Sequence, residues 1–321
     1  MKRYVVVGGA GFLGSHVVRR LLARGDHVTV FDNFTSGRRE HLEGVAGEQR
    51  LEVVEGDLKD LDATVAAVDG ADHAFHLAAN PDIARAATEP ATDFWEGTYL
   101  THHLLEALRI AAVPALTYAS GSGVYGDQGA REVDEGFGPL LPISTYGASK
   151  LGCEALISAY CHMFGLRAVA FRFANVVGPR QTHGVVFDFV RRLLDEPTHL
   201  TVLGDGSQSK SYIHVDDVID AMFLLEASPP EPFDVFNAGT GDYVTVREIA
   251  ELVVGLMGLD AVDLRFGEQP RGWKGDVPIV RFSSEKLRAR GWRRARGSHA
   301  ALEASARAIL EQARRERGAP A

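Results

Sequence analysis

The stretch GGAGFLG at residues 8–14 follows the apolar run of residues 4–7 and opens residues 12–24, whose apolar side chains recur at helical spacing. A strand, a glycine-rich turn and a helix in this order are typical of a nucleotide-binding unit. The glycines permit the tight turn and let the backbone approach a pyrophosphate, whose charge meets the positive end of the helix. The turn residues expected to bind the dinucleotide are Gly8, Gly11, Phe12, Leu13 and Gly14.

Asp32 stands at the carboxyl end of the second predicted strand, directly after residues 28–31. A carboxylate at this place accepts hydrogen bonds from the adenosine ribose hydroxyls and repels a 2′-phosphate, so it favours NAD over NADP. The neighbouring Arg38 and Arg39 are interpreted as solvated surface residues. We therefore predict NAD as the cofactor.

Short β-branched runs and helical patterns alternate through the first half of the chain. Further strands are predicted at residues 51–54, 74–77, 115–118 and 169–172, and helices near 60–69, 91–112 and 145–164. Continuous apolar strands that alternate with helices indicate a parallel sheet covered on both faces. The predicted fold class is therefore α/β, with a doubly wound Rossmann sheet.

The residue composition changes after about residue 174, where Gly, Pro, His and Asp become frequent. We place a smaller, interleaved α/β substrate-binding lobe at about residues 174–211 and 238–321. The NAD-binding domain is expected to cover residues 1–173, with a return segment at about 212–237. An arginine-rich helix with a solvated face is expected at residues 298–317. Its side chains expected to turn inward are Leu302, Ala306, Ile309, Leu310 and Ala313.

The composition excludes several classes of protein. The 321 residues carry 34 Lys and Arg against 43 Asp and Glu, a formal net charge of −9, which argues against a general nucleic-acid or anionic-membrane binder. No apolar run is long enough to span a membrane, and glycines interrupt the N-terminal run, so we expect a cytoplasmic protein. Cys153 and Cys161, the two cysteines, exclude a disulfide framework and are expected to be buried. The 12 histidines show no metal-ligand clustering, so no metal is predicted.

Tyr146 and Lys150 form a Tyr-x-x-x-Lys pair within a predicted helix. Residues four apart point from one helix face, so the two side chains are expected to lie together. A phenol with a pKa near 10 is a poor base at neutral pH, but a nearby ammonium and a positively charged nicotinamide favour its phenolate. Tyr146 is therefore predicted as the catalytic base, with Lys150 as its cation.

These motifs resemble the extended short-chain dehydrogenase/reductase superfamily, and within it the nucleotide-sugar epimerases that act on UDP-glucose or UDP-glucuronate. The glycine spacing Gly-x-x-Gly-x-x-Gly and the Tyr-x-x-x-Lys pair carry the resemblance, which spans nearly the whole chain. It implies further NAD contacts after the ribose acid, beside the adenine, in the HLAA motif of the fourth strand and around the reactive pair. The residues at these places are Asn33, Thr35, Ser36, Gly37, Asp57, Leu58, Leu77, Ala78, Ala79, Tyr146, Lys150 and Phe173.

The resemblance also implies a nucleoside-diphosphate sugar as substrate, bound by the second lobe. The residues at matching positions are Asn175, Arg180, Val185, Arg192, Thr201, Val202, Lys210, Tyr212, Arg271 and Asp276. Lys210 replaces the usual diphosphate arginine with a point charge that lacks bidentate geometry. Asp93 and Phe94 stand where the family often has asparagine, and Pro81 lies near the place of a lost cofactor-side lysine.

The third catalytic residue departs from the family pattern. Related proteins carry Ser or Thr three residues before the Val of a Val-Tyr-Gly motif, where this chain has Gly121. Ser120 and Ser122 flank this glycine. The sequence leaves open whether the hydroxyl of Ser120, that of Ser122 or neither binds the substrate oxygen.

The same segment separates the reactions of the superfamily. Nucleotide-sugar 4,6-dehydratases place an Asp-Glu pair, and UDP-glucuronate decarboxylases a Glu, just before the Val, where this chain has Ser122 and Gly123. Without an extra acid or base, the remaining reaction takes a hydride from one carbon and returns it there. We therefore expect a UDP-hexose 4-epimerase. The alternatives are a nucleotide-sugar reductase or dehydrogenase with net NAD(P)H turnover, a decarboxylase or dehydratase, and a non-enzymatic dinucleotide-sensing protein.

The identity of the hexose stays open. The resemblance most commonly implies UDP-glucose with UDP-galactose. UDP-glucuronate with UDP-galacturonate is favoured by the serine- and glycine-rich loop, which offers donors near carbon 6, and by the charge of Arg180 or Arg192. Val280 stands where some epimerases carry a bulky gate, so N-acetylhexosamines also stay open.

The family usually dimerises through the helices near residues 91–112 and 145–164, so a homodimer is expected. Apolar residues of these two helices suit either that interface or the core of one subunit. They are Leu104, Leu105, Leu108, Leu156 and Ile157.

Overall fold

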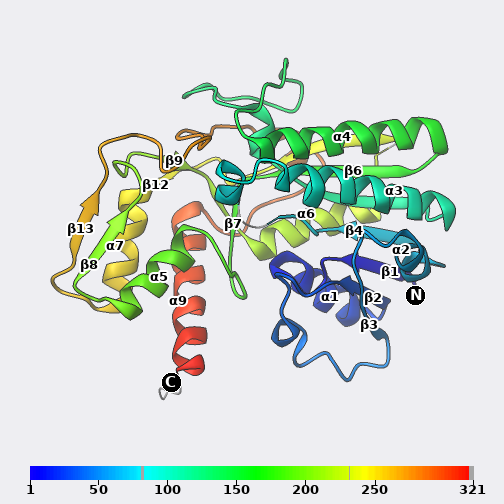
Figure 1. Ribbon diagram of the computed structural model, residues 1–321, viewed down its shortest axis with the longest axis horizontal. Helices are drawn as coiled ribbons and strands as arrows, with labels where there is room; N and C mark the ends of the chain where they lie inside the picture. Colours follow the sequence, from blue (N-terminus) through cyan, green and yellow to red (C-terminus); the bar gives the residue numbers. More distant parts are fainter. Residues whose placement is uncertain (81–82, 231, 318–321) are drawn as a thin grey trace. The chain divides into compact units, whose positions relative to one another are not determined.

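A seven-stranded sheet organises the nucleotide-binding part of the chain. In the computed structural model, which describes residues 1–80, 83–230 and 232–317, the strand order is β11-β6-β5-β4-β1-β2-β3 (Figure 1). The strands are β1 (Arg3–Val7), β2 (His27–Asp32), β3 (Leu51–Glu55), β4 (His73–His76), β5 (Ala115–Gly121), β6 (Arg167–Phe173) and β11 (Phe233–Ala238). β1 pairs in parallel with β2 and β4, as do β2 with β3 and β4 with β5. The order 3-2-1-4-5-6, extended by β11, confirms the predicted doubly wound fold.

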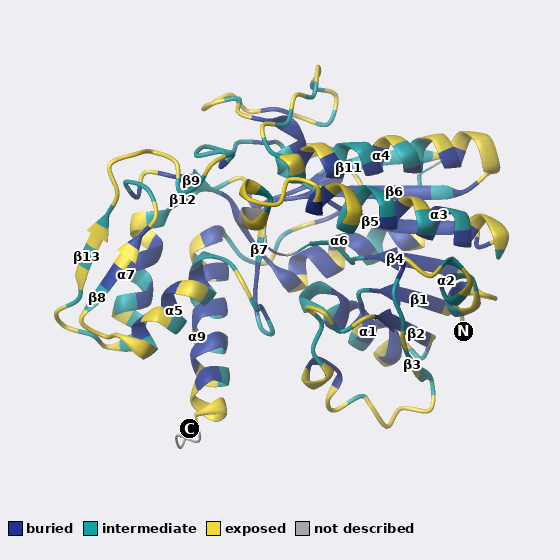
Figure 2. Ribbon diagram, in the orientation of Figure 1, coloured by how far each residue is buried: buried dark blue, intermediate teal, exposed yellow. Residues whose placement is uncertain are grey.

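Helices pack on both faces of this sheet. They are α1 (Phe12–Arg24), α2 (Leu61–Val68), α3 (Leu100–Ile110), α4 (Thr145–Phe164) and α6 (Val215–Ala227). Adjacent residues of β4 show the two faces, because successive side chains of a strand point to opposite sides. Ala74 belongs to the core cluster that includes Leu104 of α3 and Ile157 of α4, whereas the ring of Phe75 stacks on Phe223 of α6 at 5.8 Å. Figure 2 shows the resulting buried strands.

Short helical segments supply the loops around the strand ends. They are η1 (Arg39–Leu42), η2 (Ile83–Ala87), η3 (Phe94–Tyr99) and η4 (Ser122–Tyr125). The segment expected as one helix at 91–112 is divided, because η3 is a π-helical turn that precedes α3. A π-helical turn is rare and occurs frequently at functional sites. Pro81 lies outside the described residues.

The chain divides into two compact units. Unit 1 comprises Met1–Val124, Thr145–Arg172 and Ile219–Phe236, and unit 2 comprises Tyr125–Ser144, Phe173–Val218 and Asn237–Ala321. The expected domain boundaries differ at two places. Residues 125–144 group with unit 2, since the Tyr125 hydroxyl donates to Asn237 and the backbone of Val133 bridges to Phe282. The expected return segment starts later, because β10 (Tyr212–His214) pairs with β7 (Asn175–Val177) of unit 2 instead of the central sheet.

Unit 2 is built from short strand pairs and three packed helices. Its remaining elements are α5 (Val185–Asp195), β8 (His199–Val202), β9 (Ser209–Lys210), β12 (Val244–Thr245), α7 (Val246–Met257), β13 (Asp263–Phe266), α8 (Glu285–Ala289) and α9 (Ser298–Glu316). The strand pairs are β10-β7, β12-β9 and β13-β8. Helices α5, α7 and α9 share one apolar cluster, in which Leu302, Ala306, Ile309 and Leu310 are buried. Ala313 is buried too, so the predicted inner face of α9 is confirmed.

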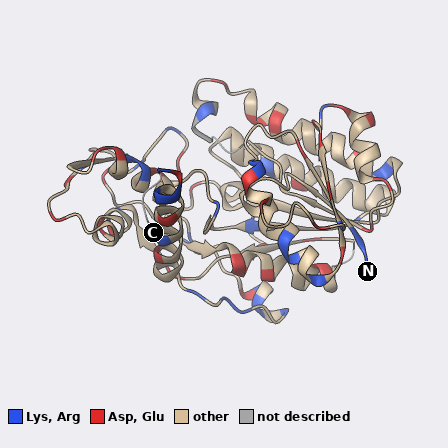
Figure 3. Cartoon of the chain, turned by 90° about the horizontal axis from the view of Figure 1, so that it is seen from below, with Lys and Arg blue, Asp and Glu red and all other residues tan. Residues whose placement is uncertain are grey.

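Ion pairs lie on the exposed side of α9, within the helix at Arg307 and Arg315 and across to α5. Arg307 contacts Glu303, and Arg191 of α5 contacts Glu316. Figure 3 shows basic and acidic residues interspersed along the described chain. Arg307 and Arg315 are exposed, so the predicted solvated face of α9 is confirmed. Both cysteines are buried, as predicted. Within the described residues, no helix is long and apolar enough to cross a membrane.

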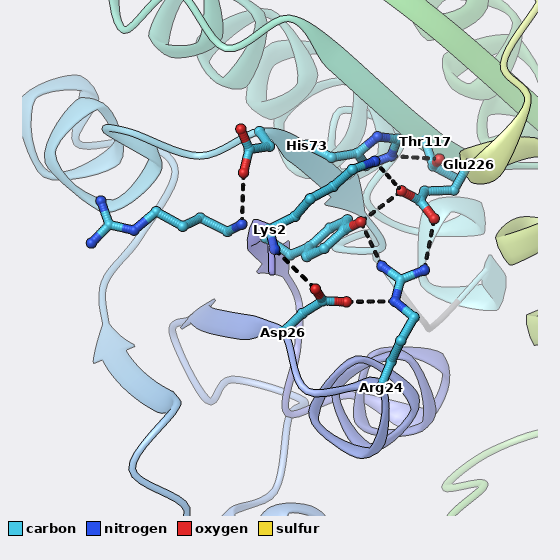
Figure 4. A network of polar contacts seen from close by, with 9 residues as sticks. Lys2, Arg24, Asp26, His73, Thr117 and Glu226 are labelled. Carbon is cyan, nitrogen blue, oxygen red and sulfur yellow. Dashed lines mark hydrogen bonds and ion pairs between the residues drawn. The ribbon is translucent and has the colours of Figure 1, made fainter.

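A polar network ties the amino end of β1 to helices α1 and α6 (Figure 4). The Glu226 carboxylate accepts hydrogen bonds from the Tyr4 hydroxyl at 2.6 Å, from Arg24 at 2.8 Å and from the Lys2 ammonium at 3.1 Å. The Glu226 side chain is only 2% exposed. A buried carboxylate with three donors is held in its charged form, so this network fastens the two helices to the sheet.

Candidate active site

The glycine-rich turn between β1 and α1 has no room for side chains at its key positions. A Cβ added at Gly14 would lie 2.1 Å from the Gly8 carbonyl oxygen, and one added at Gly8 would lie 2.7 Å from the Ala78 backbone nitrogen. Gly8 also has a φ of 78°, which favours glycine. The turn therefore packs directly against the segment that follows β4.

The N-terminus of α1 is left available for an anion. Gly11 is its N-cap residue and supplies no side-chain cap, so the first backbone N–H groups of the helix have no such partner. Gly11, Phe12 and Leu13 are only half-buried. Bare amides at the positive end of a helix are a binding site for phosphate, and this geometry fits the pyrophosphate of a dinucleotide.

Asp32 closes the other side of the turn. Its carboxylate accepts hydrogen bonds from the backbone N–H of Ala10 at 2.9 Å and of Phe34 at 2.8 Å. Burial raises the pKa of Asp32, although these two N–H donors oppose that effect. A Cβ added at Gly37 would come within 2.6 Å of Asp32 Oδ1, so Gly37 lets the loop pass over the carboxylate. A carboxylate has further acceptor sites for ribose hydroxyls.

Other predicted cofactor residues gather beside this turn. Asn33 donates to the Asp57 carboxylate at 3.1 Å, so the structure brings these two together, and Thr35 and Ser36 are exposed next to them. Leu58 is buried. After β4, the backbone of Leu77 bonds Val7, and Leu77, Ala78 and Ala79 are half-buried beside Gly8.

Tyr146 and Lys150 lie on the first turns of α4, as predicted. The Lys150 ammonium is 5.7 Å from the centre of the Tyr146 ring and 4.9 Å from that of Tyr118. It donates a hydrogen bond of 2.8 Å to the carbonyl oxygen of Ala119, at the end of β5. This bond anchors the lysine between the strand end and the phenol.

The environment of this pair perturbs both groups. Burial raises the pKa of Tyr146 to about 12, and the Asp93 carboxylate adds to the rise. Burial lowers the pKa of Lys150 to about 8, against the opposing effect of Cys153, Glu154 and Asp93. At neutral pH the lysine therefore remains a cation. A further positive charge near the phenol, such as a nicotinamide ring, favours its phenolate form.

The two candidate serines have different surroundings. Ser120 is 5% exposed, and its hydroxyl donates to Glu154 at 2.5 Å. Glu154 in turn forms a buried ion pair with Arg172 at 2.6 Å. Ser122 begins η4 and is half-buried. Around a Cβ added at Gly121, no atom of the described residues lies within 4 Å.

In unit 2, three predicted substrate residues come together. The Lys210 ammonium contacts the Asp276 carboxylate at 2.7 Å, and the Arg271 guanidinium bonds the carbonyl oxygen of Asp276. Arg271 also pairs with Asp127 at 2.6 Å. Asp276 is buried, and its carboxylate is balanced by Lys210 and accepts a hydrogen bond from the backbone N–H of Gly272 at 3.1 Å. Asp127 is a member of this cluster that the sequence analysis missed, because no motif marks it.

The remaining predicted substrate residues are more dispersed. Arg192 is exposed and donates to the carbonyl of the exposed Thr201 at 3.0 Å. The side chain of Val202 faces the core of unit 2, so only its backbone is left for a ligand. Other positions vary in exposure: Asn175 is exposed, Arg180 and Val185 are half-buried, and Phe173 and Tyr212 are buried.

Comparison with known proteins decides the family. Residues 4–239 match the model of the NAD dependent epimerase/dehydratase family. The chain belongs to this family. Within the described residues, no group of three His, Cys, Asp or Glu side chains is placed to hold a metal ion.

Similar proteins in this family include epimerases and a dehydratase. The UDP-glucose 4-epimerase of Mycolicibacterium smegmatis is 35% identical over 297 residues, which cover 90% of this chain and 93% of that protein. The structure of the Thermus thermophilus UDP-glucose 4-epimerase with NAD has a TM-score of 0.84 at 32% identity and covers 96% of this chain and 98% of that one. The dTDP-glucose 4,6-dehydratase DesIV of Streptomyces venezuelae, with NAD bound, has a TM-score of 0.89 at 29% identity, with 98% of each chain covered.

NAD is the cofactor of this family, as the sequence analysis predicted. The glycine turn, the bare N-terminus of α1 and Asp32 fit its pyrophosphate and adenosine ribose. Bound NAD supplies an acceptor and donor of hydride. Epimerases that use UDP-sugars are among the relatives, so the coarser prediction of a NAD-dependent UDP-sugar epimerase is confirmed.

Proposed function

We propose that the chain interconverts UDP-glucose and UDP-galactose by epimerisation at carbon 4. Tyr146 takes the proton of the 4-hydroxyl as the hydride leaves carbon 4, which gives a 4-keto sugar. After the sugar turns over, the hydride returns to the opposite face of carbon 4 and Tyr146 gives its proton back to the oxygen. The ammonium of Lys150 stabilises the phenolate between these two steps.

The observation that carries the proposal is the Tyr146–Lys150 pair beside Ser122 and Gly123. Lys150 is held by Ala119 with its cation toward the phenol. The dehydratases and decarboxylases that this chain resembles are expected to have acidic residues just before the Val of Val-Tyr-Gly. This chain has Ser122 and Gly123 at these positions, and neither carries a carboxyl group. Without an added acid, a Tyr-Lys pair transfers one proton from the sugar and back, while one hydride leaves the same carbon and returns to it. This supports an epimerase over the dehydratase that is also among the structural neighbours.

We assign the role of the third hydroxyl to Ser122. The Ser120 hydroxyl is already donated to the buried Glu154, whereas Ser122 is half-buried at the start of η4. Moving Ser120 toward a substrate would leave a buried carboxylate with one donor fewer.

We assign the nucleotide of the substrate to the charged cluster of unit 2. Lys210 and Arg271 supply two cations that suit a diphosphate, and the Asp276 carboxylate suits a ribose hydroxyl. Arg180, Arg192, Asn175, Val185, Thr201, Val202 and Tyr212 remain further candidates for this nucleotide.

Proton NMR of the purified protein with equal amounts of UDP-glucose and UDP-glucuronate tests the proposal without added NAD. We expect the UDP-galactose signals to grow while UDP-glucuronate stays unchanged, and we expect a Tyr146→Phe variant to be slower by about 10²-fold or more. Growth of UDP-galacturonate alone would assign a carboxylate to carbon 6 and overturn the proposed substrate. Absorbance of reduced nicotinamide that accumulates with product would indicate a dehydrogenase instead. No change in either sugar, even with NAD supplied, would overturn the epimerase proposal.

A second copy of the chain is the partner that we propose for the ends of α3 and α4. The residues left open between interface and core lie in the core cluster of unit 1: Leu104, Leu105, Leu108 and Ile157 are buried, and Leu156 packs against them partly buried. Exposed apolar residues lie instead at the helix ends and on η3: Phe94, Trp95, Ile110, Met163 and Phe164. Light scattering is expected to give the mass of a dimer, and of a monomer for an Ile110→Asp, Met163→Asp variant. A wild-type monomer would overturn this assignment.

A further inference from the structure

Asp93 is a buried carboxylate next to the reactive pair that the assignments above do not use. Its side chain is 1% exposed, and it immediately precedes the π-helical turn η3. Oδ2 accepts a hydrogen bond from the Thr145 hydroxyl at 2.7 Å, and Oδ1 accepts one from the Asn80 amide at 3.1 Å. The carbonyl oxygen of Asp93 accepts a third, from the Ser149 hydroxyl at 2.7 Å.

These bonds hold the helix turn that carries Tyr146. Thr145 precedes Tyr146 in α4, and Ser149 lies one turn further on, so Asp93 contacts α4 on both sides of the tyrosine. The Ser149 hydroxyl is also 2.9 Å from that of Thr98 in η3. A Cβ added at Gly97 would lie 2.3 Å from the Ser149 oxygen, so glycine at this place lets η3 approach α4 closely. These hydrogen bonds and the close approach at Gly97 join η3 to the first turns of α4, and we call this contact the clamp.

The charge of Asp93 is not balanced at the clamp itself. Both donors to its carboxylate, the Thr145 hydroxyl and the Asn80 amide, are neutral groups. By contrast, the nearby Glu154 is paired with Arg172. A buried carboxylate beside a phenol opposes loss of the phenolic proton, and after burial Asp93 is the largest named cause of the raised pKa of Tyr146.

The titratable groups around Tyr146 come from three elements besides the segment that carries Asp93. Lys150, Cys153 and Glu154 lie on α4, Tyr118 on β5 and His76 on β4; each interacts electrostatically with Tyr146 or Lys150. Burial lowers the pKa of His76 to about 3, so it is neutral at the working pH. Lys150 is the cation of the set, and Asp93 is a carboxylate without an ion-pair partner in contact among the described residues.

We propose that Asp93 is a positioning residue for Tyr146, which clamps the first turns of α4 to η3 and places a fixed negative charge beside the phenol. This inference rests on the base role of Tyr146 proposed above. The charge keeps the phenol protonated until the cationic nicotinamide is beside it, and it supports the ammonium of Lys150. Asp93 thereby limits formation of the Tyr146 phenolate to the complex in which the oxidised cofactor is bound.

Two substitutions separate the charge from the clamp. Asp93→Asn keeps the shape and an acceptor for Thr145 but removes the charge, whereas Thr145→Val removes one hydrogen bond and keeps the charge. For Asp93→Asn we expect the acid limb of the kcat–pH profile to move to lower pH by about one unit. The basic limb, where Lys150 loses its proton, moves in the same direction, because Asp93 raises the pKa of both groups. For Thr145→Val we expect a lower kcat with both limbs in place.

An ultraviolet titration of tyrosinate in the NAD-loaded protein gives a readout that does not need turnover. The difference between the wild type and Tyr146→Phe isolates the titration of Tyr146, and the same difference in the Asp93→Asn background is expected about one pH unit lower. Asp93→Ser serves as a second neutral variant if Asp93→Asn does not fold.

An unchanged titration in both neutral variants, or an equal shift in Thr145→Val, would overturn the role of the charge. If the wild type epimerises no nucleotide sugar, the proposed function fails, but the tyrosinate titration still decides whether Asp93 controls Tyr146. The two failures are therefore distinguishable.

Discussion

The Ser120 hydroxyl donates to Oε1 of Glu154 at 2.5 Å, inside the nucleotide-binding unit and beside the end of β5. Glu154 is held from the other side by Arg172 at 2.6 Å, and both charged side chains are almost fully buried. The chain thus uses one of its two loop serines to satisfy a buried ion pair. Because Ser120 is engaged in this way, Ser122 is the hydroxyl that we propose for contact with substrate.

Substitution of each serine by alanine is expected to have opposite signatures. Ser122→Ala should lower kcat by about 10- to 100-fold with little change in the free energy of unfolding, because it removes a hydroxyl beside the reacting oxygen. Ser120→Ala should instead lower the free energy of unfolding by about 1–3 kcal/mol, since Glu154 loses a buried donor. Steady-state kinetics and urea unfolding of both variants provide the measurements. A large loss of kcat in Ser120→Ala with unchanged stability would reverse the two roles.

Addition of a hydroxyl at Gly121 is expected to increase the epimerase rate. The space around the missing Cβ is open to at least 4 Å among the described residues, so serine fits without a clash. Serine at this place matches the pattern of the family that the sequence resembles. We expect Gly121→Ser to raise kcat severalfold and to rescue part of the loss in Ser122→Ala. Gly121→Ala is the matched control, because it adds the Cβ without the hydroxyl. Equal rates for Gly121→Ser and Gly121→Ala would contradict the prediction.

Much of the cofactor half was predictable, because it depends on local patterns. The turn at residues 8–14 and Asp32 follow from glycine spacing and from an acid after a strand. The strand and helix ranges of unit 1 agree closely with the periodicity, except for the helix expected at 91–112, which is divided into η3 and α3. The contacts of Ser120 with Glu154 and of Asp93 with Thr145 were not predictable. Each joins residues far apart in the chain, which only the packed fold brings together.

The boundaries of the two units were harder to predict for the same reason. Residues 125–144 carry little periodic signal, and their assignment depends on long-range bonds such as that of the Tyr125 hydroxyl to Asn237. The substrate residues of unit 2 were chosen by resemblance, and Lys210, Arg271 and Asp276 do lie together. Asp127 completes that cluster without any sequence signal.

Glu226→Gln is expected to reduce stability in a pH-dependent manner. Burial opposes ionisation of Glu226, but hydrogen bonds from Tyr4, Arg24 and Lys2 outweigh it and lower the pKa of Glu226 to about 2 from 4.5. A depressed acid contributes stability that is complete above pH 4.5 and is lost as the pH falls toward 2. We expect Glu226→Gln to lower the free energy of unfolding by about 3 kcal/mol at neutral pH and to flatten the acid decline.

Urea unfolding at a series of pH values measures this dependence. Asp220→Asn is the matched control, because Asp220 lies on the same helix in a half-exposed pair with Arg20 and should change stability by less than about 1 kcal/mol. An acid decline in Glu226→Gln as steep as that of the wild type would show that other groups dominate it.

Gly14→Ala tests the phosphate-binding turn directly. The added Cβ would lie 2.1 Å from the Gly8 carbonyl oxygen and 2.7 Å from the Gly9 Cα, so the turn has to open before the helix can form. Backbone cannot yield as a flexible side chain does, and the displaced amides no longer converge on a pyrophosphate. We expect the purified variant to lose bound NAD and epimerase activity together. Gly255→Ala is the matched control, because Gly255 lies inside α7 and an added Cβ would meet no described atom within 4 Å beyond its own helix backbone. Alanine there should be neutral or stabilising by about 1 kcal/mol. NAD released by denaturing each protein, quantified per chain, decides the outcome: wild-type occupancy in Gly14→Ala would mean that the cofactor is held elsewhere.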